Sequence, residues 1–144
     1  MDRVILKINA RQHNDQGEED VMELVTEAKM YRKDGAFYLV YEESELSGMD
    51  GCVTTLIIQK NKVSLKRYGA ANQELIFEEG KKYLGMYETP MGCTEMEILT
   101  DLVAPKLDEK TATGTVDVEY EISLRGLMEA RNKLLIEIAE KKEE

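Results

Sequence analysis

The sequence predicts an all-β protein, a single antiparallel up-and-down β-barrel of about eight to ten strands. Residues 114–124 alternate strictly between apolar and polar side chains, which is the pattern of a strand with one buried face. Weaker alternating runs of strand length recur along the chain, and turn-forming residues separate them. We expect strands joined by such tight turns to be antiparallel neighbours.

Eight such runs precede residues 114–124, and none of them is a convincing helix. They cover residues 3–9, 20–31, 36–43, 52–59, 62–68, 73–78, 81–88 and 93–101. The turn signals are Asp34-Gly35, Asn61-Lys62, Glu79-Gly80, Pro90-Met91-Gly92 and Arg125-Gly126. Asn, Asp and Gly reach the positive φ that a tight hairpin turn requires, so these positions support the division into strands.

The segment 127–140 is open to two interpretations. As a helix, it would place several apolar residues on one face, namely Leu127, Ala130, Leu134, Leu135 and Ile138. As a strand, it alternates at Leu134, Ile136 and Ile138, and it directly follows a glycine-containing turn. We favour the strand, and we predict that residues 129–139 pair with residues 115–124.

The number of strands makes a closed barrel the expected architecture. A sheet of nine or ten strands must dispose of its unpaired edges, and closure removes them. The chain has no internal repeat, no low-complexity tract and no linker rich in Pro and Ser. We therefore expect residues 1–144 to form one barrel domain.

The charge of the chain excludes several classes of partner. With 19 Lys and Arg against 29 Asp and Glu, the formal net charge is −10. Such a chain repels phosphate backbones and anionic lipid, so we expect neither nucleic acid nor a membrane as a partner. No apolar run approaches the length needed to span a bilayer or to form a signal peptide, so we expect a cytoplasmic protein.

The residues that could carry catalysis are few. His13 is the single histidine and lies in a polar stretch that we expect to be a solvated loop. Cys52 and Cys93 have neither CxxC spacing nor a nearby histidine in the sequence, so we expect no metal site and no reactive thiol. Because nucleophilic catalysis needs a positioned base, we expect a protein that is not an enzyme and uses no cofactor.

Several short segments, taken in order, resemble a known family of small bacterial proteins. They are 23–27 (ELVTE), 41–44 (YEES), 46–49 (LSGM), 54–56 (TTL), 67–70 (RYGA), 77–80 (FEEG) and 87–92 (YETPMG). Together they resemble the YwiB-like family, a domain of unknown function, over residues 4–140. The resemblance implies a calycin-like, or lipocalin-like, β-barrel and a bacterial cytosolic setting. It implies no activity.

The alternation of two strands leaves two interpretations open for Glu43 and Arg67, one of which is a buried ion pair. Both faces of residues 37–43 are apolar, so Glu43 must point where Leu39 and Tyr41 point, and Arg67 shares a face with Leu65. If that face is the barrel interior, Glu43 needs a partner, and Arg67 is the natural candidate. Alternatively, Glu43 lies in water at the barrel mouth and Arg67 extends out of its strand end.

Two functions are compatible with a barrel of this size. The first is a lumen that holds a small apolar or amphipathic ligand. Its polar fixing points would be Tyr41, Glu43, Arg67 and Tyr87, and its walls would be Leu39, Thr54, Leu65 and Met96. The second is a filled barrel whose outer surface contacts another protein, with a homodimer as one form.

Overall fold

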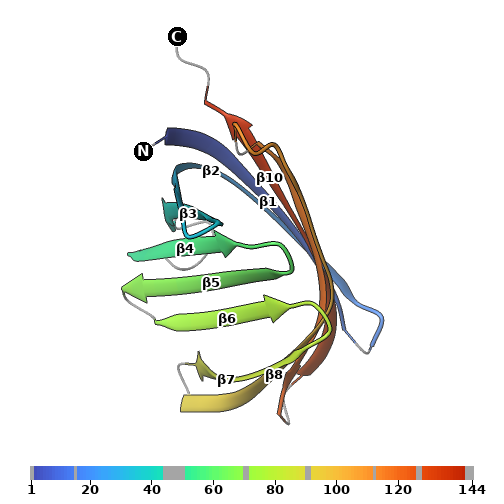
Figure 1. Ribbon diagram of the computed structural model, residues 1–144. Helices are drawn as coiled ribbons and strands as arrows, with labels where there is room; N and C mark the ends of the chain where they lie inside the picture. The colour runs from blue at the N-terminus through green and yellow to red at the C-terminus, as the bar shows by residue number, and fades with distance from the viewer. Residues whose placement is uncertain are drawn as a thin grey trace.

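The computed structural model describes residues 2–14, 16–43, 51–69, 72–89, 92–111, 113–125 and 128–141. Ten strands run through these residues (Figure 1). They are β1 (Asp2–Asn14), β2 (Glu19–Lys33), β3 (Ala36–Glu42), β4 (Cys52–Ile58), β5 (Lys62–Gly69), β6 (Gln73–Glu78), β7 (Lys82–Thr89), β8 (Gly92–Leu107), β9 (Gly114–Leu124) and β10 (Met128–Glu140).

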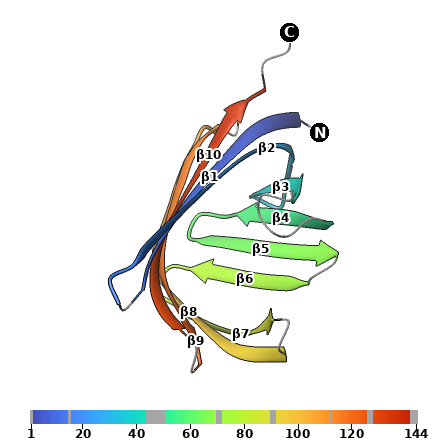
Figure 2. The ribbon, with the colours of Figure 1, turned by 180° about the vertical axis from the view of Figure 1, so that it is seen from behind.

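All ten strands belong to one antiparallel sheet, and its order confirms the predicted up-and-down topology. The order is β6-β5-β4-β3-β2-β1-β10-β9-β8-β7, so strands that follow each other in sequence pair, except β6 with β7, and the first strand pairs with the last. The long strands β1, β2, β9 and β10 form a curved wall, and the short strands β4, β5 and β6 lie across its concave side (Figures 1 and 2). The result is a nearly closed barrel whose interruption lies between β6 and β7.

The last segment of the chain is a strand, as we predicted. β10 pairs with β9 from Met128 opposite Leu124 to Ile138 opposite Gly114. Ile136 and Ile138 point into the buried core, so the period of two seen at the end of the segment reports its structure correctly.

The prediction that His13 lies in a loop is wrong. β1 continues to Asn14, and His13 is paired with Arg131 of β10 on one side and Glu19 of β2 on the other. Two flanking strands satisfy the backbone of this polar stretch, so it needs no apolar pattern to remain extended. The side chain is solvent-exposed, as expected, and its Nε2 lies 3.8 Å from a Glu19 carboxylate oxygen.

The strand at residues 93–101 is also longer than predicted. β8 runs to Leu107, with a register shift against β9 between Thr100 and Leu102. The shift changes which residues face inward, from Ile98 and Thr100 before it to Val103 after it. Because the register shift changes which residues face inward, the alternating sequence pattern stops at the shift, although the strand continues beyond it.

The barrel interior is a packed apolar core over much of its length. Its fully buried side chains include Leu6, Leu39, Leu56, Ile98 and Ile136. Phe77 of β6 contacts Tyr120 of β9 across the interior, with ring centroids 4.5 Å apart. Burial raises the pKa of the Tyr120 hydroxyl to about 12, so it is protonated at neutral pH.

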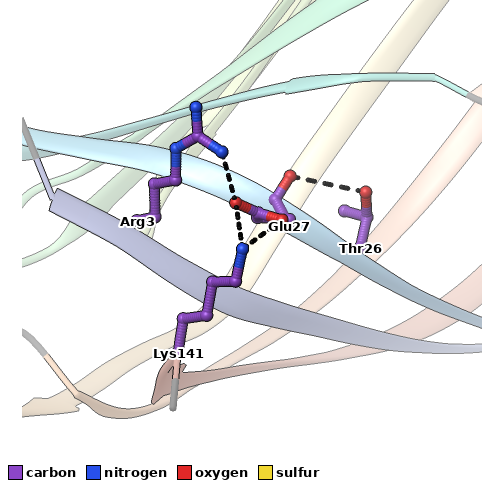
Figure 3. A network of polar contacts seen from close by, with 4 residues as sticks. All are labelled: Arg3, Thr26, Glu27 and Lys141. Carbon is purple, nitrogen blue, oxygen red and sulfur yellow. Dashed lines mark hydrogen bonds and ion pairs between the residues drawn. The ribbon is translucent and has the colours of Figure 1, made fainter. Parts of the chain in front are cut away.

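An ion-pair network on the outer face connects β2, β1 and the end of β10, close to where the first and last strands pair. The Glu27 carboxylate on β2 accepts from Lys141 Nζ at 3.0 Å and from Arg3 Nη1 at 3.1 Å (Figure 3). Lys141, directly after β10, therefore reaches β2 across β1. The hydrogen bond from Lys141 is the main cause that lowers the pKa of Glu27, and Arg3 adds to it against the opposing effect of burial.

We predict that Lys141→Met raises the pKa of Glu27 more than Arg3→Met does, as measured by carboxyl carbon shifts in an NMR titration. Because the folded-state pKa is depressed, this carboxylate adds stability above its unfolded-state pKa. That contribution is lost as the pH falls through the folded-state value. The control Lys133→Met removes a lysine that contacts Glu119 and should leave Glu27 unchanged. Equal shifts in all three variants would contradict this assignment.

Candidate functional site

A row of four inward-facing residues crosses strands β3 to β6. Tyr41 is paired with Thr54, Thr54 with Arg67, and Arg67 with Gln73. Each lies on the face that its strand turns toward the core, because side chains alternate along a strand. We call these four residues the polar row.

Glu43 joins the polar row from the end of β3. Its backbone N–H donates to the Cys52 carbonyl at 2.9 Å, which extends the pairing of β3 and β4 by one residue. Its side chain is 2% exposed. Thr54 Oγ1 donates to Glu43 Oε1 at 2.6 Å, so one hydrogen bond to the carboxylate comes from the adjacent strand.

Arg67 supplies the charge that a buried carboxylate requires. Its Nη2 lies 3.4 Å from Glu43 Oε1, and its side chain is 15% exposed. Nη1 donates to Gln73 Oε1 at 3.2 Å, so β6 holds the guanidinium from the other side. The structure thus brings Glu43 and Arg67 together inside the barrel, and the alternative of a solvated Glu43 is wrong.

Two donors of this cluster have no hydrogen-bond partner among the described residues. They are Arg67 Nε and Gln73 Nε2, and both atoms are buried. Arg67 uses both terminal nitrogens on Glu43 and Gln73, and Gln73 uses its oxygen on Arg67. The cluster therefore holds two buried N–H donors that no described residue satisfies, which is an uncommon state for buried polar atoms.

Tyr41 adds a neutral hydroxyl to the cluster. It is 4% exposed, and its pKa is raised well above its usual value, first by burial and then by the negative charge of Glu43. The hydroxyl is therefore protonated at neutral pH, and the charges of the cluster are those of Glu43 and Arg67.

The interior wall beside the cluster is incompletely covered where the sheet is interrupted. Four apolar residues that face inward on β5, β6 and β7 are half-buried, namely Leu65, Leu75, Tyr83 and Tyr87, whereas Val63 and Phe77 on the same inner faces are fully buried. On the opposite wall, Leu6, Val116 and Ile136 are completely buried, and Ile122 and Leu134 are half-buried. The half-buried apolar surface that lies next to the polar row is therefore that of Leu65 and Leu75.

A tyrosine side chain bridges the interruption between β6 and β7. Tyr83 on β7 donates its hydroxyl to the Glu74 carbonyl on β6 at 3.1 Å. Its ring lies over Gly85, where a Cβ atom would come within 2.9 Å of the ring. The turn between the two strands is anchored separately, because Gly80 donates to the Thr100 carbonyl of β8 at 2.9 Å. We call this side-chain-bridged interruption the seam.

The eight residues that the sequence singled out fall into three places. Tyr41, Glu43, Thr54 and Arg67 meet in one cluster, and Leu65 is the next inward-facing residue on β5. Leu39 and Met96 belong to the closed core, with exposed fractions of 0% and 1%. Tyr87 lies on β7, across the seam. Of these eight, Arg67, Leu65 and Tyr87 are partly exposed, and the other five are buried.

Sequence reasoning missed Gln73, Leu75 and Tyr83. Gln73 lies two residues before Leu75 and four before Phe77, so the alternation of residues 73–78 already placed a polar side chain on an apolar face. That signal could have identified Gln73. The bridging role of Tyr83 carries no such signal, because it depends on where the barrel is interrupted.

Two hollows lie on the outer surface, away from the cluster. One of about 480 Å³ is lined mainly by outward-facing residues of β7 to β10, such as Lys82, Glu97 and Arg131. The other, of about 430 Å³, is lined by residues that include Asn9, Leu102 and Lys133. Neither is lined by any of the eight predicted residues. The outer charges beside the larger hollow pair with one another, as in Arg131 with Glu121 at 2.7 Å.

The groups that usually carry metal or thiol chemistry are dispersed. Cys52 is buried, Cys93 is exposed, and they form no disulfide. Within the described ranges, no three His, Cys, Asp or Glu residues come together as a possible metal site. The same ranges contain no helix that is long and apolar enough to cross a membrane.

The chain is similar to known proteins in family and in fold. Residues 6–136 match the family model DUF1934, described as a domain of unknown function. The crystal structure of the ywiB protein from Bacillus subtilis superposes with a TM-score of 0.83 at 20% sequence identity, covering 98% of this chain and 93% of that one. At this identity the likeness shows a common fold. None of the curated proteins matches the sequence.

We predict different effects from the same substitution at two buried threonines. Thr54→Val removes a hydrogen bond to a buried carboxylate and should lower the free energy of unfolding by about 1.5–3 kcal/mol. Thr100 is 1% exposed, and its Oγ1 has no partner among the described residues, so Thr100→Val should be neutral or slightly stabilising. Urea unfolding of both variants measures the difference. Similar losses at both sites would contradict the assigned role of Thr54.

Proposed function

The chain belongs to the DUF1934 family, a family of unknown function, and from that premise we propose that it is a non-enzymatic binding protein for a small amphipathic molecule. The ligand sits at the polar row and extends along the half-buried Leu65 and Leu75 on the inner faces of β5 and β6. The observation that carries this proposal is the pair of buried, unpartnered donors Arg67 Nε and Gln73 Nε2. A buried donor without an acceptor is costly, and a ligand oxygen would satisfy it.

The surroundings of these donors support an amphipathic ligand. Leu65 and Leu75 are paired with each other and form the next inward-facing pair along β5 and β6 after Arg67 and Gln73. Both leucines are half-buried, so apolar surface lies next to the unpartnered donors. A molecule with an apolar part and an acceptor group would cover both.

This proposal assigns fewer residues to ligand contact than the sequence suggested. Leu39, Thr54 and Met96 are fully buried and already packed, so we assign them to supporting the site instead of contacting the ligand. Glu43 and Tyr41 position Arg67 and limit the charge of the site. A cytosolic setting in a bacterium is part of the same proposal, since a reducing compartment suits two cysteines that form no disulfide.

A second candidate function has its own observation. Leu84 and Met86 face outward on β7 with exposed fractions of 72% and 55%. β7 is an end strand of the sheet, with a ladder to β8 alone in the described residues. Exposed apolar residues on such a strand favour contact with another protein, including a second copy of this chain.

We predict that two leucine variants separate these functions. Leu65→Gln, on the inner face, should weaken binding of the uncharged probe Nile red about tenfold, because it replaces apolar surface at the site. Leu84→Gln, on the outer face, should leave the probe affinity unchanged. Fluorescence titration measures the affinities, and thermal unfolding checks that both variants are folded.

The opposite pattern would reject the ligand-binding proposal. If neither the parent chain nor the variants take up the probe, the inner face is not a binding site. If Leu84→Gln in addition lowers the mass of the protein in light scattering, the outer face of β7 is a contact between copies, and the second function replaces the first.

A further inference from the structure

The unpartnered atoms of the cluster define what a ligand must supply. Arg67 Nε and Gln73 Nε2 are both N–H donors, so a ligand group that meets either of them has to be an acceptor. The Tyr41 hydroxyl is neutral, and the one carboxylate of the cluster already accepts from Thr54 and Arg67. A ligand amine or ammonium group would place its own N–H donors against the N–H donors of Arg67 and Gln73. The acceptor is therefore an oxygen of a carbonyl, a carboxylate or a similar group.

The charge of the cluster discriminates between these acceptors. Glu43 Oε1 lies 3.4 Å from Arg67 Nη2, so the single positive charge of the cluster is already compensated by a negative one. A ligand carboxylate at Nε would place a second negative charge on the same guanidinium, within a few ångströms of Glu43. In a partly buried site this repulsion is weakly screened, and the net charge of −10 acts in the same direction. A neutral carbonyl avoids it.

We propose, resting on the function proposed above, that the ligand carries an uncharged carbonyl, of the ester, amide or ketone type. Arg67 Nε and Gln73 Nε2 donate to this oxygen, and Glu43 is the residue that disfavours carboxylates. Glu43 does this without touching the ligand, by taking up the positive charge that would otherwise attract an anion. The apolar part of the ligand lies against Leu65 and Leu75.

The test compares two probes that differ in charge and share an alkyl chain. Octanoate and methyl octanoate compete with Nile red at pH 7.5, where the acid is ionised. The ester is also the more apolar compound, so the preference of the parent chain alone does not isolate the charge effect. The decisive quantity is the change in the ratio of the two affinities between the parent chain and Glu43→Gln, because the difference in apolarity cancels.

We expect Glu43→Gln to shift that ratio toward octanoate by about tenfold, because the variant leaves the Arg67 charge uncompensated. The matched control Glu42→Gln changes an exposed glutamate on the outer face of the same strand and should leave the ratio unchanged. An unchanged ratio in Glu43→Gln, or an equal shift in both variants, overturns the charge argument while Nile red binding still supports a ligand site. Absence of Nile red binding removes the proposed function itself.

A second variant keeps the inference testable if Glu43→Gln does not fold. Gln73→Leu removes one of the two unpartnered donors, together with the acceptor of Arg67 Nη1, without changing either charge. It should weaken methyl octanoate about threefold to tenfold, the effect of one lost hydrogen bond. An unchanged ester affinity in a folded Gln73→Leu protein would show that this donor does not contact the ligand, and the inference would be rejected.

Discussion

The buried carboxylate of Glu43 imposes the constraint on which the β3 to β6 half of the barrel depends. A buried charge without a partner costs several kcal/mol, so the strands around it must deliver a donor and a cation to the same place. Thr54 comes from β4 and Arg67 from β5, and Gln73 on β6 holds the guanidinium. Side chains on a strand change face at each residue, so a slip of β5 by one position would turn Arg67 outward and leave Glu43 unpaired. The ion pair therefore fixes the register of four strands.

The other half of the barrel is fixed by apolar packing and by the pairing of its first and last strands. β1 pairs with β10, and Lys141 extends that connection across the outer face to β2. Since the termini are closed in this way, the interruption of the sheet lies between β6 and β7. Tyr83 bridges it with a side-chain hydrogen bond in place of a backbone ladder. The polar row ends on β6, so the donors that we assign to a ligand lie on the strand that borders the seam and on its neighbour β5.

Much of this fold could be predicted from the sequence because its strands keep a period of two. The strand at residues 114–124 and the pairing of 129–139 with it were both predicted, and the inward direction of Glu43 and Arg67 was one of the two alternatives that the alternation left open. Alternation gives the face of a strand and not the position of a residue around or along the barrel. For this reason the sequence did not separate Leu39 and Met96, which are core residues, from Leu65 beside the site. It also could not locate the seam, which depends on the closure of β1 with β10.

The most direct test of this account is a double-mutant cycle of Glu43→Gln and Arg67→Met, followed by denaturant unfolding. The account predicts that each single variant is strongly destabilised, by about 3–5 kcal/mol, because its partner is left buried and unpaired. It also predicts a coupling energy above about 1 kcal/mol between the two positions. A coupling near zero, with nearly silent single variants, would mean that both groups are solvated as in an exposed pair worth about 0–1 kcal/mol. That result would contradict the central claim that a buried ion pair organises this end of the barrel.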